Sequence, residues 1–223
     1  MISWNTDKEL FEIIKTRLYT AVVGDIMDTM GLQHQFLPAH IRPLREDMIL
    51  VGRAMTVKEE DIPEGAAAGK PFGVMFEALD DLKEDEVYIC SGSSYRYALA
   101  GELMATRARL LKAAGFAVDG YIRDTRGLLA MGMPVFSLGS YAQDQGVRGR
   151  VTAYRVPITV GEVQVNPGDI VFGDIDGVLV IPRSHEKEII LKAWEKVNGE
   201  RTVETAIKAG MPTVEAFETF GIM

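Results

Sequence analysis

The sequence predicts an α/β domain with mixed strands, followed by a helical tail. In the first half of the chain, short apolar runs alternate with segments of helical periodicity. Residues 151–182 consist mostly of short β-branched runs separated by turn residues, and helical periodicity returns from Ser184. A length of 223 residues fits one ordinary domain.

The first hundred residues begin with two predicted helices. Residues 7–19 place their apolar side chains on one helical face, and residues 21–31 form a helix that ends at Gly31. A strand over 48–57 follows, with a bulge or a close backbone approach at Gly52. Beyond it we expect a loop over 59–71, a helix over 72–82, and a strand over 86–90 that runs into the small-residue turn 91–94.

Residues 101–127 combine regular structure, close turns and charges that look buried. Apolar residues recur at helical spacing from Glu102 to Ala114, and Gly115 is expected to end this helix in the left-handed conformation. A short buried strand over 116–118 follows and leads through a turn to the pair Arg123-Asp124.

The remaining chain is rich in strands and then helical. We expect strands over 133–136, 151–156, 158–160, 162–165 and 178–181, with glycine and proline corners between them. Asp169, Asp174 and Asp176 lack the spacing of a calcium loop and are interpreted as turn residues. The tail has Ser184 as its expected N-cap, and Asn198-Gly199 is expected to interrupt it, so that Glu200 begins its second part.

Composition and charge exclude several classes of function. A net charge of -8 argues against a nucleic-acid partner, because such binding depends on lysine and arginine that neutralise phosphates. No apolar run is long enough to cross a membrane and the N-terminus lacks a basic signal region, so we expect a cytoplasmic protein with no membrane partner. Cys90 is the single cysteine, and its strand-like surroundings indicate a buried apolar role.

The pair Arg123-Asp124 has two interpretations. It can be an ion pair on the rim of the sheet, or it can be part of a site. The return from helix to strand can carry Glu102 to the same sheet edge, so that two carboxylates and a cation surround a helix N-terminus. Such a set suits a divalent cation that is held by few protein oxygens and several waters, with an anionic substrate completing its shell.

These segments resemble a known family. The runs GELMATRA, GFAVDGYIRDTRG, MGMPVF and VNPGDIVFGDIDGVLVIPR are similar, in order and spacing, to those of the RraA-like proteins, which include 4-hydroxy-4-methyl-2-oxoglutarate / 4-carboxy-4-hydroxy-2-oxoadipate aldolases. The resemblance covers roughly residues 20–212. It implies a layered ββα "swivelling" domain over 1–183, an extension over 184–223 that packs on a neighbouring subunit, and assembly as a homotrimer or hexamer.

The resemblance also implies roles for individual residues. Asp124 would bind Mg²⁺ or Mn²⁺ directly, Arg123 would contact the substrate's oxygens, and Glu102 would hold metal-bound water. Glu200 would approach the metal of a neighbouring subunit through water, although a solvated position on a helix face is equally consistent with the sequence.

An anion site is expected beside these residues. Backbone N–H groups of the 91–94 turn, including Ser93, and of Gly101 and Leu103 at the helix start could face the substrate. An ordinary flexible connection is the alternative for the turn. The chain carries SGSSYRY where the family tends to have paired glycines, which leaves the identity of the substrate open.

The expected activity is a metal-dependent aldolase. The resemblance implies that a 4-hydroxy-2-oxo acid is cleaved to pyruvate and a second oxo acid, with oxaloacetate decarboxylation as a side activity. Arg123, Asp124 and Glu102 are the expected catalytic residues, and a small anionic 2-oxo acid is the expected partner. The alternative is a non-catalytic regulator of an RNA-processing endonuclease, although family members of that kind tend to lack a tail such as 184–223.

Overall fold

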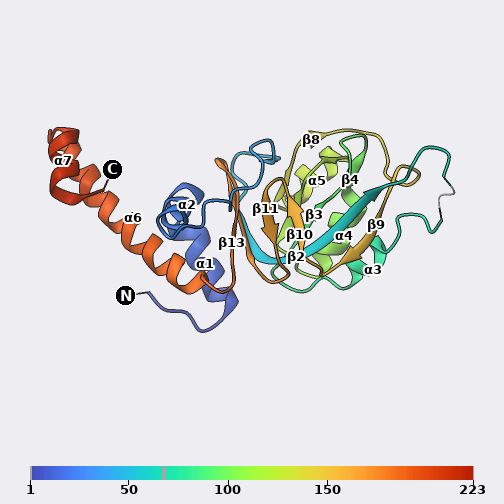
Figure 1. Ribbon diagram of the computed structural model, residues 1–223, viewed down its shortest axis with the longest axis horizontal. Coiled ribbons are helices and arrows are strands. Elements are labelled where there is room, and N and C mark those ends of the chain that lie inside the picture. Colours follow the sequence, from blue (N-terminus) through green and yellow to red (C-terminus); the bar gives the residue numbers. More distant parts are fainter. Residues whose placement is uncertain (1, 67–68, 223) are drawn as a thin grey trace. The chain divides into compact units, whose positions relative to one another are not determined.

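Figure 1 shows the computed structural model, which describes residues 2–66 and 69–222. The chain divides into two compact units. The segment from His34 to Arg183 forms the α/β unit, and the segments up to Gln33 and from Ser184 form the helical unit. The N-terminal helices therefore group with the C-terminal helices. The packing of residues 184–223 on a neighbouring subunit stays a prediction.

The α/β unit is built on a mixed sheet. Within the described residues the sheet has eight strands in the order β1-β7-β5-β3-β2-β12-β13, and β9 pairs with β2. The strands are β1 (Arg42–Pro43), β2 (Leu50–Asp61), β3 (Glu86–Ser91), β5 (Gly115–Val118), β7 (Val135–Ser137), β9 (Gly149–Tyr154), β12 (Ile170–Asp174) and β13 (Gly177–Ile181). The central strands β2, β3, β5 and β7 are parallel, whereas β1, β9, β12 and β13 pair antiparallel.

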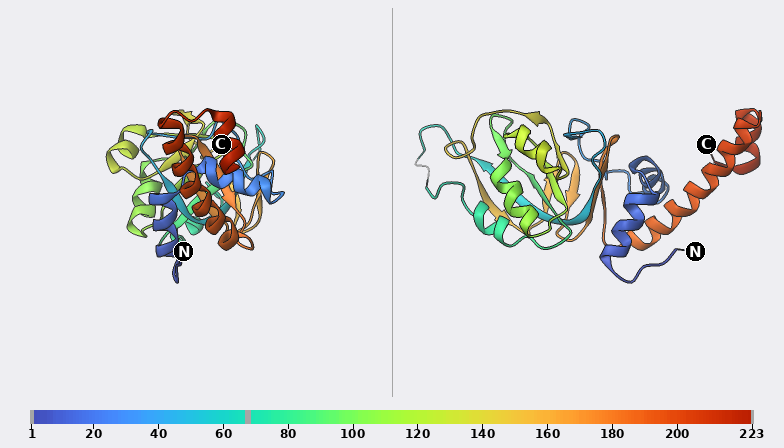
Figure 2. Two further views of the ribbon diagram at one scale, coloured as in Figure 1. Left: turned by 90° about the vertical axis from the view of Figure 1, so that its left-hand side faces the viewer. Right: turned by 180° about the vertical axis from the view of Figure 1, so that it is seen from behind.

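Smaller elements cover this sheet. The helices are α3 (Met75–Asp80), α4 (Glu102–Leu110) and α5 (Thr125–Met131). A short parallel sheet is made of β4 (Ala98–Ala100), β6 (Tyr121–Ile122) and β8 (Gly139–Ser140), and β10 (Ile158–Val160) and β11 (Val163–Val165) form a hairpin. The helices lie on one face of the main sheet and the hairpin on the other (Figures 1 and 2).

The alternation of side chains along β3 shows why both faces are covered. Tyr88 and Cys90 belong to the buried cluster that includes residues of α3, α4 and α5, whereas Val87 and Ile89 belong to the cluster that includes the β10–β11 hairpin. Successive residues of a strand point to opposite faces of the sheet, so a strand that is apolar throughout needs a layer on each side. The predicted α/β class with a C-terminal helical segment is confirmed.

The helical unit contains α1 (Asp7–Arg17), α2 (Thr20–Thr29), α6 (Glu186–Lys208) and α7 (Thr213–Phe220). The predicted interruption at Asn198-Gly199 is wrong, because α6 continues through both residues and Glu200 lies inside it. A Cβ on Gly199 would overlap Cδ1 of Ile222, so this glycine permits a close approach within the unit. The N-cap of α6 is His185 and not Ser184.

Three other predictions of local structure need correction. Residues 59–61 belong to β2 rather than to a loop, because they pair with β9; residues 67 and 68 of the predicted loop lie outside the described residues. The helix α4 ends at Leu110, and Lys112 takes the left-handed conformation (φ 60°) that was expected of Gly115. Strand β12 was missed, because it is buried on both faces along most of its length and shows no polar alternation.

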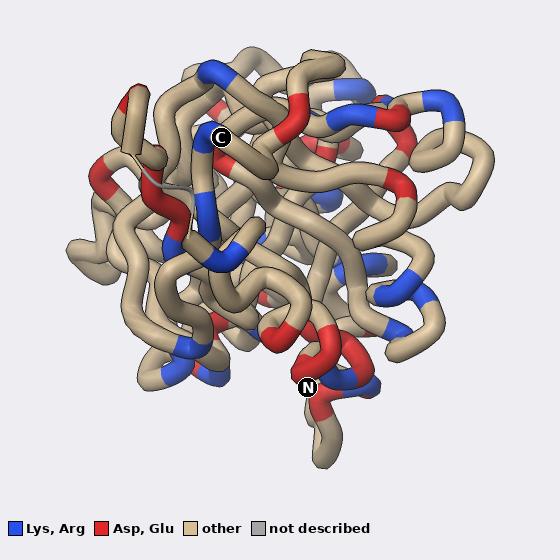
Figure 3. Tube along the Cα trace, turned by 90° about the vertical axis from the view of Figure 1, so that its right-hand side faces the viewer, with Lys and Arg blue, Asp and Glu red and all other residues tan. Residues whose placement is uncertain are grey.

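Charge is spread along the chain. Figure 3 shows acidic and basic residues interspersed along the trace. None of the helices built from the described residues is both long enough and apolar enough to cross a bilayer. The expected absence of a nucleic-acid partner stays a prediction.

Candidate functional site

The start of α4 lies against the pair Arg123-Asp124. Strand β4 ends at Ala100, and Gly101 is the N-cap of α4 in an extended conformation. A Cβ on Gly101 would lie 2.6 Å from Oδ2 of Asp124 and 3.2 Å from Cγ of Arg123. The helix can begin this close to the pair only because Gly101 has no side chain.

Asp124 has an unusual backbone conformation. It is the N-cap of α5 and lies in the left-handed region, with φ 56° and ψ 35°. Its Oδ2 accepts a hydrogen bond of 3.2 Å from the backbone N–H of Glu102, which joins the start of α4 to the start of α5. Non-glycine residues in this region are uncommon and concentrate at functional sites.

The Glu102 side chain lies against α5. A Cβ on Gly127 would overlap the carboxylate of Glu102, so the glycine leaves room for this group. Within the described residues, the Glu102 carboxylate and Oδ1 of Asp124 form no hydrogen bond or ion pair. The predicted meeting of Glu102 with Asp124 therefore occurs, and both residues keep carboxylate oxygens available.

Arg123 lies between two carboxylates. Its Nη1 forms an ion pair of 2.7 Å with Oδ1 of Asp144, and its Nε lies 3.7 Å from Oδ2 of Asp124. Its backbone N–H donates to the carbonyl of Ala100, which ties β6 to β4. Asp144 was not predicted from the sequence, because it lies in a loop without a recognisable motif.

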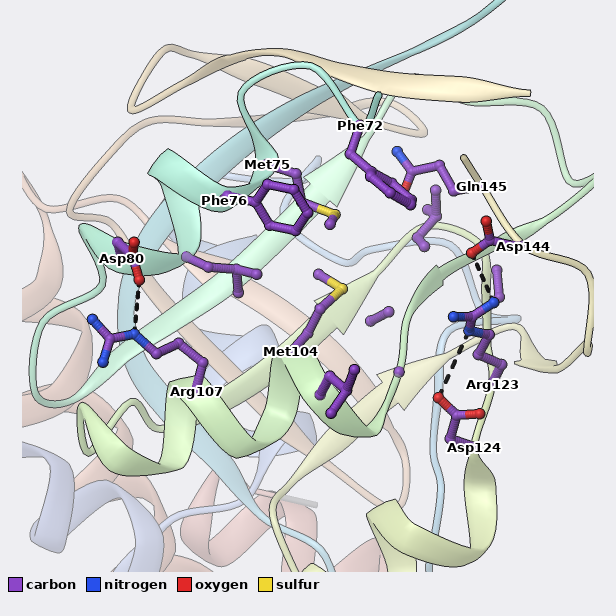
Figure 4. Close-up of a pocket in the computed structure, with 16 residues that line it drawn as sticks. Phe72, Met75, Phe76, Asp80, Met104, Arg107, Arg123, Asp124, Asp144 and Gln145 are labelled. Atoms are coloured by element: carbon purple, nitrogen blue, oxygen red, sulfur yellow. Dashed lines mark hydrogen bonds and ion pairs between the residues drawn. The ribbon is translucent and has the colours of Figure 1, made fainter. Parts of the chain in front are cut away.

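These residues line a cavity of about 510 Å³. Figure 4 shows Arg123 between Asp124 and Asp144, with aromatic residues and methionines beside them. The lining residues are Phe72, Met75, Phe76, Leu79, Asp80, Ala98, Leu99, Ala100, Gly101, Leu103, Met104, Arg107, Arg123, Asp124, Asp144 and Gln145. Gly101, Leu103, Arg123 and Asp124 are thus brought to one cavity.

Three predicted site residues are not part of this lining. Glu102 contacts it only through its backbone N–H, which donates to Asp124. Ser93 is not part of the cavity lining, and the N–H of the next residue, Ser94, donates to Asp61 over 3.0 Å. Glu200 lies on α6 in the helical unit, where it accepts a hydrogen bond from the Tyr19 hydroxyl. The roles predicted for Ser93 and Glu200 stay predictions.

A buried carboxyl lies behind the cavity. Glu59 in β2 is fully buried, and its Oε2 accepts a hydrogen bond of 2.7 Å from Nε2 of Gln145, which lines the cavity. Its Oε1 has no hydrogen-bond partner in the described part of the chain. Burial raises the pKa of Glu59 to about 8, although the hydrogen bond from Gln145 acts in the opposite direction. Sequence reasoning missed Glu59 because its charged neighbours resemble those of a loop.

The donor set can be compared with what a divalent cation requires. Among the described residues, no group of three or more histidine, cysteine or acidic side chains is arranged to hold a metal. Asp124 and Glu102 provide two carboxylates at the starts of α5 and α4, and Mg²⁺ commonly binds proteins through one or two carboxylates plus water and substrate. Carboxylate and water ligands also suit Mn²⁺. The residues present therefore fit either ion.

Comparison with known proteins identifies the family of the chain. The family model described as RraA-like (Aldolase/RraA) matches residues 20–180. The chain belongs to the RraA-like family. A protein of Halalkalibacterium halodurans named "Putative 4-hydroxy-4-methyl-2-oxoglutarate aldolase" is 32% identical over 198 residues, which are 89% of each chain.

Solved structures share the fold of the chain. The chain matches Streptomyces coelicolor RraAS2, described as an unusual member of the RNase ES inhibitor RraA protein family, with a TM-score of 0.78 and 24% identity. This match covers 91% of this chain and 99% of that one. A structure described as one of novel cellulases from microbes associated with the gut ecosystem has a TM-score of 0.82 and 33% identity, covering 91% and 90% of the two chains.

Proposed function

We propose that the chain is a divalent-metal-dependent aldolase that cleaves a 4-hydroxy-2-oxo acid to pyruvate and a second carbonyl compound. The observation that carries this proposal is the arrangement of Arg123 beside Asp124 in the wall of one cavity, with the backbone N–H of Glu102 bonded to Asp124. Relatives that carry the name "Putative 4-hydroxy-4-methyl-2-oxoglutarate aldolase" support the same reaction class. Oxaloacetate decarboxylation passes through the same enolate and is expected as a side activity.

The reaction breaks the bond between C3 and C4 of the substrate. The 4-hydroxyl loses its proton, the C4–O bond becomes a carbonyl, and the electron pair of the C3–C4 bond moves into a pyruvate enolate. Negative charge accumulates on the former keto oxygen. In this proposal Arg123 donates to that oxygen, so it stabilises the transition state more than the ground state.

The other residues bind and orient the substrate. Asp124 would bind Mg²⁺ or Mn²⁺ directly and Glu102 would contact the ion through water; the ion acts as a Lewis acid when bound. The first turn of α4 has backbone N–H groups without intrahelical acceptors, and in this proposal those near Leu103 face the substrate carboxylate. Asp144 holds the Arg123 guanidinium in place through its ion pair. The available carboxylate of Glu102 would keep a water in position to receive the hydroxyl proton.

The proposal is tested by measuring pyruvate release. We expect turnover of 4-hydroxy-4-methyl-2-oxoglutarate and oxaloacetate with Mg²⁺ or Mn²⁺, and its loss with a chelator. Arg123→Ala should lower kcat by roughly a hundredfold to a thousandfold, the usual cost of removing one preorganised donor. Asp124→Ala should abolish the metal dependence of the activity. Arg126→Ala is the matched control, because Arg126 is exposed and is not part of the cavity lining.

Near-normal metal-dependent turnover by Arg123→Ala would contradict the assignment. Absence of pyruvate under every condition would overturn the enzyme proposal and favour the non-catalytic regulator. Binding of the purified chain to an RNA-processing endonuclease would then be the measurement to make.

A further inference from the structure

The cavity continues from Arg123 along an apolar wall. Phe72, Met75, Phe76 and Met104 lie between the Arg123 cluster and the ion pair of Arg107 with Asp80, as Figure 4 shows. A volume of about 510 Å³ lies within the range of sites that bind drug-sized ligands. The three-carbon pyruvate unit fills only part of such a space. The remainder is available to the other half of the substrate.

Phe72 is held in position by its backbone. Its φ of 61° lies in the left-handed region, where a bulky residue is an outlier. Its carbonyl accepts hydrogen bonds from the N–H groups of Met75 (3.3 Å) and Val151 (3.2 Å). A Cβ on Gly73 would overlap the carbonyl oxygen of Val151, so the chain is docked tightly on β9 at this point. The strained conformation is therefore maintained by contacts on both sides.

The Phe72 ring lies close to the ion pair that Arg123 forms with Asp144. A Cβ on Gly146 would lie 3.3 Å from Cζ of Phe72 and 2.7 Å from Oδ2 of Asp144, the partner of Arg123. The rings of Phe72 and Phe76 follow one another with centroids 5.6 Å apart. Phe76 remains 52% exposed, although large aromatic side chains usually bury most of their surface. An aromatic surface thus extends directly from the proposed reaction centre.

The charged residues that line the cavity disfavour the binding of a second carboxylate of the substrate. Its ionisable residues are Asp80, Arg107, Arg123, Asp124 and Asp144, which are three acids and two bases. Arg107 donates from Nε to Oδ1 of Asp80 over 2.8 Å, so this cation is already neutralised. Among the described lining residues, no unmatched cation faces the aromatic half. A carboxylate there would lose hydration without gaining a partner.

We propose that the C4 substituent of the substrate is an apolar group of about the size of an aromatic ring, bound against Phe72, Phe76 and Met104. This inference rests on the proposed aldolase function and specifies its substrate class. The representative reaction converts 4-hydroxy-2-oxo-4-phenylbutanoate to pyruvate and benzaldehyde. The C3–C4 bond breaks, the hydroxyl proton leaves as the aldehyde forms, and C3 of the enolate takes up a proton from solvent.

The test compares kcat/KM for this phenyl substrate with kcat/KM for 4-hydroxy-4-methyl-2-oxoglutarate, whose C4 carries a carboxylate. We expect the wild-type enzyme to prefer the phenyl substrate by tenfold or more, since a pocket contact of this size contributes about 10- to 200-fold. Phe76→Ala should reduce this preference about tenfold. Phe76→Lys should reverse it, because it adds a cation for the second carboxylate. Structural damage alone would not make the variant prefer the dicarboxylate.

Phe36→Ala is the matched control, because Phe36 is 46% exposed and is not a lining residue. Turnover of the dicarboxylate in preference to the phenyl substrate would overturn the inference and leave the aldolase proposal intact. If Phe76→Ala dissociated a homo-oligomer without changing the preference, the aromatic wall would be an interface between copies, which also overturns it. Absence of pyruvate from either substrate and from oxaloacetate would instead refute the aldolase proposal itself.

Discussion

Glu59 is a carboxyl that the fold keeps away from water. It lies in β2 at 0% exposure, and the uncharged amide of Gln145 donates a hydrogen bond to its Oε2. Burial raises its pKa to about 8. Burial of such a carboxyl costs less free energy in the protonated form than in the ionised form. Because Gln145 follows Asp144 directly, Glu59 also helps to hold the loop that positions the partner of Arg123.

Replacing Glu59 should change how stability depends on pH. The folded chain keeps the proton of Glu59 up to a pKa of about 8, whereas the unfolded chain releases it near the ordinary value of 4.5. Between these values the unfolded state binds fewer protons, so the free energy of unfolding falls as pH rises. Glu59→Gln removes this loss and should be the more stable protein at pH 7, by up to about 3 kcal/mol. The advantage should shrink to about 1 kcal/mol at pH 5, where the unfolded chain has released most but not all of this proton.

Urea unfolding at pH 5, 7 and 8 measures this difference. Glu64→Gln is the control, because it alters an exposed carboxylate in the segment after β2. A stability difference between Glu59→Gln and wild type that stays constant from pH 5 to 8 would show that Glu59 titrates normally in the folded protein.

At the scale of elements, two glycines set the contact between the starts of α4 and α5. Gly101 lets the first turn of α4 approach Asp124, and Gly127 leaves room for Glu102 against α5. Neither glycine has a positive φ, so both are needed for space and not for backbone conformation. The backbone of Glu102 therefore lies against Asp124, and its carboxylate lies against Gly127, because two short helices meet at positions that lack a Cβ.

Gly127→Ala tests this packing. The new Cβ would overlap the Glu102 carboxylate, which is the flexible end of a side chain and can move away. Alanine favours a helix over glycine by about 0.5–1 kcal/mol, so the free energy of unfolding should stay constant or rise. Metal affinity and kcat should each fall about 10- to 100-fold, as for other groups that support a metal site. Isothermal titration with Mn²⁺ and steady-state kinetics measure both effects.

A double-variant cycle shows whether the effect acts through Glu102. If it does, Gly127→Ala combined with Glu102→Ala should cost little more than Glu102→Ala alone. Additive losses would mean that Gly127→Ala perturbs the site by another route.

The sequence was sufficient where local patterns carry the signal. The apolar run of β3, the helix after Gly101 and the Arg123-Asp124 pair can be recognised from short-range patterns and turn residues. Asp144 and Gln145 could not be predicted, because the pairing of β9 with β2 positions their loop and involves residues about ninety positions apart. Gly115 was expected to end α4 in the left-handed conformation, but Lys112 takes that conformation. Gly115 is required instead where β5 passes close to the carbonyl of Pro134.

At the scale of the whole molecule, the helical unit contains Glu200, a predicted site residue that lies outside the α/β unit. Glu200 lies on α6 and accepts from Tyr19, while Nζ of Lys196 lies 3.9 Å from its Oε1. Burial and the hydrogen bond to Glu200 raise the pKa of Tyr19, so its hydroxyl remains a donor to the carboxylate. The carboxylate is thus fixed on its own helix. The proposed homo-oligomer would present it to the site of a neighbouring subunit.

Mixed oligomers test this arrangement. Asp124→Ala and Glu200→Gln should each lose activity when prepared alone, the second by about 10- to 100-fold because it would act through water on the metal. When the two variants are coexpressed with different tags and purified through both, each mixed ring contains a site that combines an intact Asp124 with an intact Glu200 of the next subunit. Such a trimer should recover on the order of a third of wild-type kcat. Glu195→Gln, an exposed position on the same helix, is the control. Mixed rings that are no more active than Glu200→Gln alone would place the action of Glu200 within its own chain or outside the reaction.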